Sequence, residues 1–453
     1  MESLYKKLDN YKEKGIIPFH MPGSKRNPRL TLGEPFEMDI TEIDGFDNLH
    51  DAKGILAYEM DRGAQLFKAD EALLLVNGST AGILAAINGA VLQREKVLVA
   101  RNAHIAVINA IIMRNLTPVY IVPEKDDYGI DKGISAKQVG DTLEKDPEIK
   151  AIIITSPTYE GMVSEIKEIA DIAHGKGIPL IVDAAHGAHL AFSPLFTKSA
   201  QEAGADAVVV SLHKTLPALT QTGLLLLNGP LIDRKRVKYF WNAYQTTSPS
   251  YVLMGSISAC FDVLASSQGK ELMEHYVKRV ITLRMNLNNN LENIRLLDSD
   301  DPSKLVFLAS DGRTLFKRML DEYNIQFEMG MPGYALAMTS LADTKEMYTE
   351  LSKAIRNIDN DFGPPETLGS YSRESLPEMG MVPWRAMEYN FLKAEDVDIN
   401  KAAGRVVTEN ICMYPPGIPV VIAGEVLDGT TLDMAKAALR SCNRNYVMCL
   451  ITD

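Results

Sequence analysis

The stretch VVVSLHKTLPALTQTG, residues 208–223, joins an apolar run to a polar loop through a lysine. Its three valines predict a buried strand, and Ser211, His213 and Lys214 follow at the strand's end. A buried amine loses the hydration of its charge, so lysines are usually found on surfaces. The position of Lys214 favours a chemical role. The structural alternative is a lysine whose stem is buried and whose amine reaches solvent.

Lys214 belongs to a series of apolar runs that alternates with helical segments from about residue 70 to 230. Helical stretches such as TAGILAAINGAVLQ and EIKEIADIAHGKG separate the runs. Continuous rather than alternating apolar runs are typical of strands covered by helices on both faces of a parallel sheet. We therefore predict an α/β domain. The runs are EALLLV, KVLVARN, TPVYIVPE, AIIITSPTY, IPLIVDAAH, ADAVVVSLHK and GLLLLNG.

The composition argues against several classes of protein. The 453 residues carry a net charge of -12 and have a pI near 5.3, which argues against nucleic-acid binding. No run of about 18 apolar residues predicts a membrane span, and the N-terminal residues do not form a secretory signal. The four cysteines lack zinc-type spacing and are too few for a disulfide framework, so we expect the reducing cytoplasm and no metal site.

The pattern along the chain predicts three parts. Residues 1–54 are rich in proline, glycine and charge and predict an irregular N-terminal arm, whereas 55–285 contain the alternating pattern of the large domain. Residues 286–453 predict a smaller α+β domain. Within it, the stretch 342–358 predicts an amphipathic helix. Its apolar face consists of Met347, Leu351, Ala354, Ile355 and Ile358.

Polar residues follow several of the apolar runs, at the edge where open α/β sheets bind their ligands. The turn NGSTAG, 77–82, precedes a helix and offers backbone N–H groups and hydroxyls to a phosphate, although a simple N-cap is the commoner reason for Ser79 and Thr80. His104 follows another run and suits either ring stacking or a structural hydrogen bond. Asp183 ends a third run, where a buried carboxylate needs a cationic or protonated partner.

These residues together fit one cofactor, pyridoxal 5'-phosphate (PLP). A lysine binds its carbonyl carbon covalently, and an aspartate keeps its ring nitrogen protonated so that the ring accepts electrons released at Cα. A helix N-terminus and hydroxyls hold its phosphate. The combination is much more specific than any one of its members.

The sequence resembles the PLP-dependent Orn/Lys/Arg decarboxylases of aminotransferase fold type I, in the short bacterial form without an N-terminal wing domain. The likeness covers nearly the whole chain. The motifs that carry it are PFHMPGSKR, DITEIDGFDNLHDAKG, NGSTAG, RNAH, SPTYEG, VDAAHGAH, SLHKTLPALTQTG, YQTTSPSYVLMGS and GRVVTENICMYPPGIPVVIAGE.

The resemblance implies a role for each matching residue. Lys214 would bind the cofactor covalently, Asp183 would contact the ring nitrogen, and His104 would stack on one ring face with Ala185 on the other. The residues expected near the phosphate are Ser79, Thr80, Ser211 and His213, together with Thr247 and Ser248 from a partner subunit. A site at a subunit interface would make the protein a homodimer or a multiple of dimers. Glu425, with Tyr414 nearby, is the candidate for the distal cation of a basic substrate; alternatively, Glu425 is an ordinary turn carboxylate.

The chain departs from the family pattern at several positions near the substrate and phosphate regions. The departures are Ser24, Ile83, Ile105, Ala106, Ala184 and Glu160. Since Lys214 and Asp183 match, the cofactor prediction stands, and the identity of the substrate is left open.

The predicted reaction is α-decarboxylation of arginine, lysine or ornithine to CO2 and an amine of polyamine metabolism, with Lys214 or a histidine returning a proton to Cα. Two alternatives remain. One is transamination or lyase chemistry on the same fold, and the other is a catalytically quiet homologue that regulates.

Overall fold

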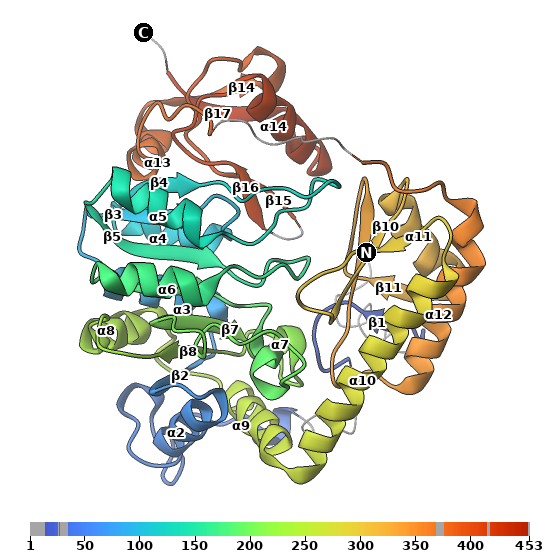
Figure 1. Cartoon of the computed structure of the whole chain (residues 1–453). Helices are drawn as coiled ribbons and strands as arrows, with labels where there is room; N and C mark the ends of the chain where they lie inside the picture. The colour runs from blue at the N-terminus through green and yellow to red at the C-terminus, as the bar shows by residue number, and fades with distance from the viewer. Residues whose placement is uncertain (1–13, 26, 28–34, 368–375, 415–416, 452–453) are drawn as a thin grey trace.

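The computed structural model describes residues 14–25, 27, 35–367, 376–414 and 417–451. All seven predicted apolar runs form strands of one sheet, with the order β2-β8-β7-β6-β5-β3-β4. Only β8 runs antiparallel to its neighbours. The strands are β2 (Glu71–Leu75), β3 (Lys96–Ala100), β4 (Thr117–Ile121), β5 (Ile149–Thr155), β6 (Leu180–Asp183), β7 (Ala207–Ser211) and β8 (Gly223–Leu227). The mainly parallel sheet that the sequence predicts is confirmed (Figure 1).

Helices follow the strands and bury their apolar side chains in a continuous core. Figure 1 shows α5 and α6 side by side on one face of the sheet. Helices α3 and α8 pack closely because Gly89 of α3 lies directly against the backbone of Val237 in α8. The helices are α2 (Ile55–Phe67), α3 (Gly78–Ala90), α4 (Ile105–Met113), α5 (Ala136–Lys145), α6 (Ile166–Gly175), α7 (Leu212–Thr215) and α8 (Arg234–Tyr244).

A second unit follows α9 (Tyr251–Ala265) and the long α10 (Ser267–Asn290). Its antiparallel sheet has the order β12-β13-β10-β9. Helix α12 (Lys345–Ile358) confirms the amphipathic helix predicted over 342–358, with Leu351, Ala354, Ile355 and Ile358 buried. The other elements are β9 (Arg295–Leu296), β10 (Lys304–Leu308), α11 (Gly312–Tyr323), β12 (Met329–Met331) and β13 (Tyr334–Met338). The three-residue strand β1 (Ile17–Phe19) of the predicted arm pairs with β11 (Ile325–Phe327).

The C-terminal elements form a third group with a core of its own. Figure 1 shows this group beside β4 and away from α10–α12. The segment predicted as one domain, 286–453, therefore contains two separate groups of elements, and α10 runs unbroken through the predicted boundary at 285. The elements are α13 (Pro383–Leu392), β14 (Ala394–Asp398), β15 (Ile411–Met413), β16 (Ile418–Val421), α14 (Gly429–Ser441) and β17 (Tyr446–Leu450).

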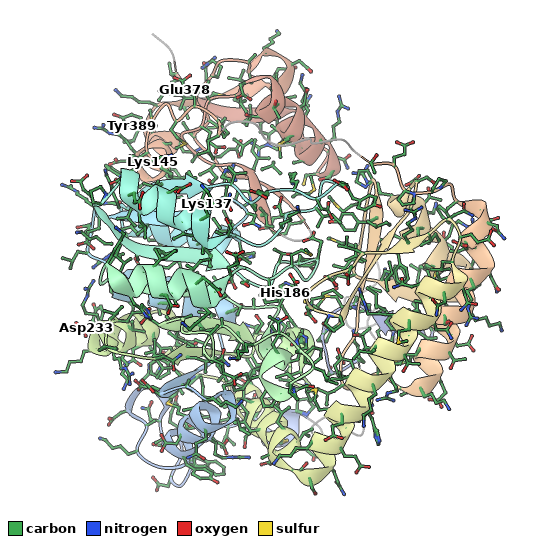
Figure 2. The ribbon with its side chains drawn as sticks, viewed as in Figure 1. Lys137, Lys145, His186, Asp233, Glu378 and Tyr389 are labelled. Atoms are coloured by element: carbon green, nitrogen blue, oxygen red, sulfur yellow. The ribbon has the colours of Figure 1, made fainter. Side chains whose placement is uncertain are left out.

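The direction of the strands decides where polar residues gather. Strands β2, β3, β5, β6 and β7 run the same way, so their carboxyl ends lie at one edge of the sheet. Figure 2 shows His186, just beyond β6, between this edge and the antiparallel sheet. Within the described ranges, no helix combines the length and apolar character that crossing a bilayer requires.

The contact between α3 and α8 gives a test of the packing. A Cβ at Gly89 would lie 2.6 Å from Val237 Cα, whereas a Cβ at Gly140 in α5 would meet only Ile172 Cδ1 at 3.7 Å. We expect Gly89→Ala to lower the free energy of unfolding by about 1–3 kcal/mol through overpacking. The matched control, Gly140→Ala, should raise it by about 0.5–1 kcal/mol, because alanine favours the helix. Chemical denaturation measures both. Equal stability of the two variants would contradict this packing.

Candidate active site

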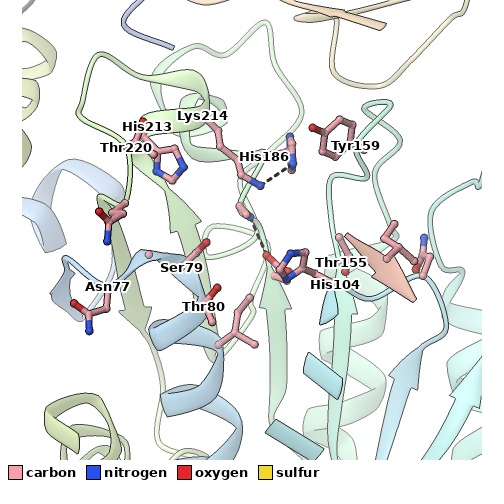
Figure 3. Close-up of a pocket in the computed structure, with 17 residues that line it drawn as sticks. Asn77, Ser79, Thr80, His104, Thr155, Tyr159, His186, His213, Lys214 and Thr220 are labelled. Atoms are coloured by element: carbon pink, nitrogen blue, oxygen red, sulfur yellow. Dashed lines mark hydrogen bonds between the residues drawn. The ribbon is translucent and has the colours of Figure 1, made fainter. Parts of the chain in front are cut away.

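A cavity of about 350 Å³ opens where the parallel strands end. It brings together seven residues that the sequence predicts for the cofactor: Ser79, Thr80, His104, Asp183, Ala185, His213 and Lys214. Figure 3 labels five of them, whose side chains lie around one space: Ser79, Thr80, His104, His213 and Lys214. The seven residues come from the end of β6 and from the segments that follow β2, β3, β6 and β7.

Lys214 reaches this cavity from α7, directly after β7. Its Nζ lies 2.9 Å from Nε2 of His186 (Figure 3). Burial lowers the pKa of the Lys214 amine, against the opposing effect of the carboxylates of Asp183 and Glu328. A lowered pKa makes more of the amine neutral, and the neutral amine is the nucleophilic form.

Asp183 is the last residue of β6, and its side chain is buried. Its Oδ1 accepts a hydrogen bond from the backbone N–H of Ala185 at 3.1 Å. This bond holds the carboxylate at the floor of the cavity, where it can accept a further hydrogen bond from a ligand.

His104 caps the N-terminus of α4. Its Nδ1 accepts a hydrogen bond from the N–H of Ala106 at 3.2 Å, which leaves the proton of the neutral ring on Nε2. Burial lowers the pKa of His104, the Lys214 amine adds to the lowering, and the Asp183 carboxylate opposes it. A flat, neutral ring therefore faces the cavity.

Tyr414 lies close to His104, with Gly417 between them. A Cβ built on Gly417 would be 3.1 Å from His104 Nε2 and 3.0 Å from Tyr414 Cε1. The Tyr414 side chain is exposed and lies outside the cavity lining.

The N-terminus of α3 forms one wall. Gly78 has a φ of 75°, and its N–H donates to the carbonyl of Gln221 at 2.9 Å. Asn77 does not cap the helix with its side chain, so first-turn N–H groups remain available to an anion. Ser79 Oγ is 2.8 Å from Oγ of the fully buried Ser211, which therefore supports Ser79 from behind and does not line the cavity. His213 Nδ1 donates to the Thr222 carbonyl at 2.9 Å.

The cavity suits a polar, planar ligand. Buried polar atoms of three lining residues have no hydrogen-bond partner within the described part of the chain: Asn102 Oδ1, Thr155 Oγ1 and His186 Nδ1. Unpaired buried polar atoms are rare in folded proteins unless a ligand or water pairs with them. An amine, a carboxylate and a helix N-terminus in the same cavity match the carbonyl, ring nitrogen and phosphate of PLP, so the residues fit this cofactor. No group of His, Cys, Asp and Glu in the described ranges is arranged to hold a metal ion.

The structure does not bring Glu425 into the cavity. Its carboxylate accepts hydrogen bonds from Nε of Arg101 at 3.1 Å and from an Nη of the same residue at 3.0 Å, and the N–H of Ile422 donates to it at 2.9 Å. Both side chains are buried. In this subunit the carboxylate neutralises Arg101 and joins the C-terminal group to the end of β3. The expected contact of Glu425 with a substrate stays a prediction.

Thr247 and Ser248 lie on the exposed connection between α8 and α9 and do not line the cavity of their own chain. Their contribution to the site of a partner stays a prediction.

Several lining residues were not predicted from the sequence: Asn77, Asn102, Thr155, Tyr159, His186, Thr220, Gln221 and Ile418. Thr155 ends β5 and Tyr159 follows in the next loop, so applying the strand-end rule to every strand would have found both. Ile418 comes from β16, far along the chain, and no local pattern points to it.

Comparison with known proteins first identifies the class. The fold is that of the constitutive lysine decarboxylase of Escherichia coli, with a TM-score of 0.77 and 20% identity over 99% of this chain and 81% of that one. An SPT variant solved with PLP matches with a TM-score of 0.60 and 15% identity over 76% of this chain and 87% of that one. The predicted fold, a fold type I architecture of PLP enzymes, is confirmed.

The family follows from the sequence. The model of the Orn/Lys/Arg decarboxylase major domain matches residues 2–306, and that of the Orn/Lys/Arg decarboxylase C-terminal domain matches 367–445. An arginine decarboxylase of Bacillus subtilis is 29% identical over 94% of this chain and 91% of its own length. The chain belongs to the Orn/Lys/Arg decarboxylase family, and the predicted enzyme class, a decarboxylase of basic amino acids, is confirmed.

The buried pair of Arg101 and Glu425 can be tested directly. We expect Glu425→Gln to lower the free energy of unfolding by about 3–5 kcal/mol, because the Arg101 guanidinium is left buried without its carboxylate. The control is Glu322→Gln, which removes a carboxylate 2.9 Å from Arg318 on the surface and should cost less than about 1 kcal/mol. Urea denaturation compares them. Unchanged stability of Glu425→Gln, with a raised KM for substrate, would contradict the structural role and support the predicted contact of Glu425 with the substrate.

Proposed function

We propose that the protein is a PLP-dependent α-decarboxylase and that arginine is its first candidate substrate. The observation that carries the proposal is the shared cavity of the Lys214 amine, the buried Asp183 carboxylate and the N-terminus of α3. Arginine is put first because four curated relatives that match 93% or more of this chain are named arginine decarboxylases. The net charge of -12 also suits a cationic substrate.

Lys214, Asp183 and His104 each have a task in this reaction. When bound, PLP supplies a carbonyl that an amine attacks and a ring that accepts the electron pair released as the bond from Cα to the carboxylate breaks. Lys214 provides the attacking amine, and its burial keeps a larger share of that amine neutral. The buried Asp183 would hold a proton on the ring nitrogen, and the half-buried, neutral ring of His104 would cover one face of the cofactor.

The phosphate would be held by the first turn of α3. Ser79 and Thr80 line this wall, and Ser211 fixes the Ser79 hydroxyl through their 2.8 Å contact. His213 lines the same cavity with its Nδ1 committed to the Thr222 carbonyl, so only its Nε2 can turn to a ligand. Tyr414, exposed beside His104, is our candidate for contacting the substrate at the entrance.

We further propose that the active form is a homodimer, or a multiple of dimers, in which Thr247 and Ser248 complete the phosphate site of the partner. Their exposed position outside their own cavity supports this arrangement. The cytoplasm is the proposed location, in keeping with free thiols at Cys260, Cys412, Cys442 and Cys449. The amine product would enter polyamine metabolism.

The covalent role of Lys214 is tested by substitution. Lys214→Ala should abolish both decarboxylation and the visible absorbance of bound cofactor, because no other lysine lines the cavity among the described residues. The control, Lys167→Ala, removes an exposed lysine of α6 and should behave as wild type. CO2 release from labelled arginine, lysine and ornithine measures activity. A keto acid as product would indicate transamination instead.

The shared phosphate site is tested by mixing two inactive proteins. One carries Lys214→Ala, and the other carries Thr247→Ala with Ser248→Ala. If Thr247 and Ser248 act across the interface, each mixed dimer regains one intact site, and random mixing restores about a quarter of wild-type activity. If they act within their own subunit, no activity returns. Size-exclusion chromatography confirms that subunits have exchanged.

A further inference from the structure

One contact of the cavity has no part in the function described so far. Nε2 of His186 lies 2.9 Å from Nζ of Lys214, as the dashed line in Figure 3 shows. The two residues come from different strands: His186 follows β6, and Lys214 follows β7. The contact therefore exists only because neighbouring parallel strands end side by side.

His186 is held in place from several directions. Its carbonyl accepts a hydrogen bond from Nζ of Lys304 at 3.4 Å, and its ring packs against the Tyr159 ring with 4.4 Å between centroids. The Tyr159 hydroxyl donates to the carboxylate of Glu328, which fixes that ring in turn. The next residue, Gly187, has no room for a side chain, because a Cβ there would lie 2.8 Å from Pro157. The first and last of these contacts fix the backbone around His186, and the imidazole cannot turn away from Lys214 without disturbing its packing against Tyr159.

The chemistry of the pair defines which atom donates. Burial lowers the pKa of His186 well below its ordinary value, so its ring is neutral. The Lys214 nitrogen carries hydrogens in both of its protonation states, so it can always donate to Nε2. The proton of the neutral imidazole is then on Nδ1, the atom that has no partner within the described part of the chain.

We propose that His186 is a positioning residue for Lys214: by accepting a hydrogen bond at Nε2, it holds the amine in place and directs its lone pair into the cavity. A lysine side chain is a flexible four-carbon stem, and its amine rotates freely unless a hydrogen bond fixes it. With one N–H committed to His186, the lone pair of the neutral amine points away from the imidazole. The inference rests on the proposed function of Lys214 as the attacking amine.

The same hydrogen bond affects the titration of Lys214. An acceptor stabilises a buried ammonium more than a neutral amine, so the loss of Nε2 should lower the pKa of Lys214 further. The other charged or titratable groups around this amine keep their places in a His186 variant: the carboxylates of Asp183 and Glu328 favour the ammonium, and the Lys304 cation opposes it. The rings of His104 and His213 also lie in the cavity.

The test uses the full-length, cofactor-free protein, in which the Lys214 amine is available for labelling. Trace acetylation with acetic anhydride between pH 6 and 11, read at Lys214 by mass spectrometry, gives the titration midpoint of this one amine. His186→Phe keeps a ring against Tyr159 but removes the acceptor. The matched variant, His186→Gln, loses the ring but returns an acceptor oxygen close to the position of Nε2.

We expect the midpoint of Lys214 to fall by about 1–2 pH units in His186→Phe and to return most of the way in His186→Gln. In the cofactor-loaded enzymes, kcat should fall on the order of tenfold in His186→Phe, because the amine is no longer oriented, and should be largely recovered in His186→Gln. The proposal is overturned if His186→Phe keeps the wild-type midpoint, or if the midpoint shifts equally in both variants. If His186 only packed against Tyr159, His186→Phe would resemble wild type more closely than His186→Gln.

Two further measurements distinguish an unfolded variant, or a wrong proposed function, from a wrong role for His186. Thermal unfolding shows whether His186→Phe is folded, and His186→Ala replaces it as the variant without an acceptor if it is not. Wild-type protein that neither gains visible absorbance with PLP nor releases CO2 would refute the proposed function. The labelling comparison would still decide whether His186 holds the Lys214 amine, because it needs neither cofactor nor substrate.

Discussion

The parallel direction of five strands is the constraint on which the site depends. Strands β2, β3, β5, β6 and β7 all end at one edge, so residues more than 100 positions apart in sequence, such as Ser79 and Lys214, line one cavity. The apolar runs of the sheet bury its interior, and the chemistry is confined to the residues just beyond them. The apolar strands thus stabilise the fold, and the residues that follow them line the cavity.

Charged side chains are also buried at this edge of the sheet, and residues of the second unit provide some of the opposite charges that pair with them. Asp301, from the loop before β10, lies 3.1 Å from His189 and 3.3 Å from Lys304, and all three side chains are fully buried. Burial alone would raise the pKa of Asp301, but His189 and Lys304 lower it below its usual range. The Lys304 amine also donates to the carbonyl of His186. The antiparallel unit therefore supports the cavity from behind, next to the residue that contacts Lys214.

Local sequence patterns predicted the strands of the sheet and the polar residues at their ends. The seven apolar runs became seven strands, and polar residues directly after them, such as Asp183 and His104, line the cavity. Pairings between distant segments could not be predicted, because they depend on how the units dock. The carboxylate of Glu425 looked available in sequence, yet it pairs with Arg101, 324 positions away. The contact between His186 and Lys214 likewise depends on the order of β6 and β7 in the sheet.

The structure shows where two of the departures from the family pattern, Ile83 and Glu160, lie. Ile83 lines the cavity with an apolar side chain where the family usually has asparagine, so that wall offers one polar group fewer to a ligand. Glu160 accepts a hydrogen bond from the Tyr334 hydroxyl at 2.7 Å, and burial raises the pKa of its carboxyl group. It thereby ties the loop that carries Tyr159 to β13 of the antiparallel unit. Neither departure touches Lys214 or Asp183. These two departures thus lie in the wall of the cavity and at the junction with the second unit, while Lys214 and Asp183 are retained.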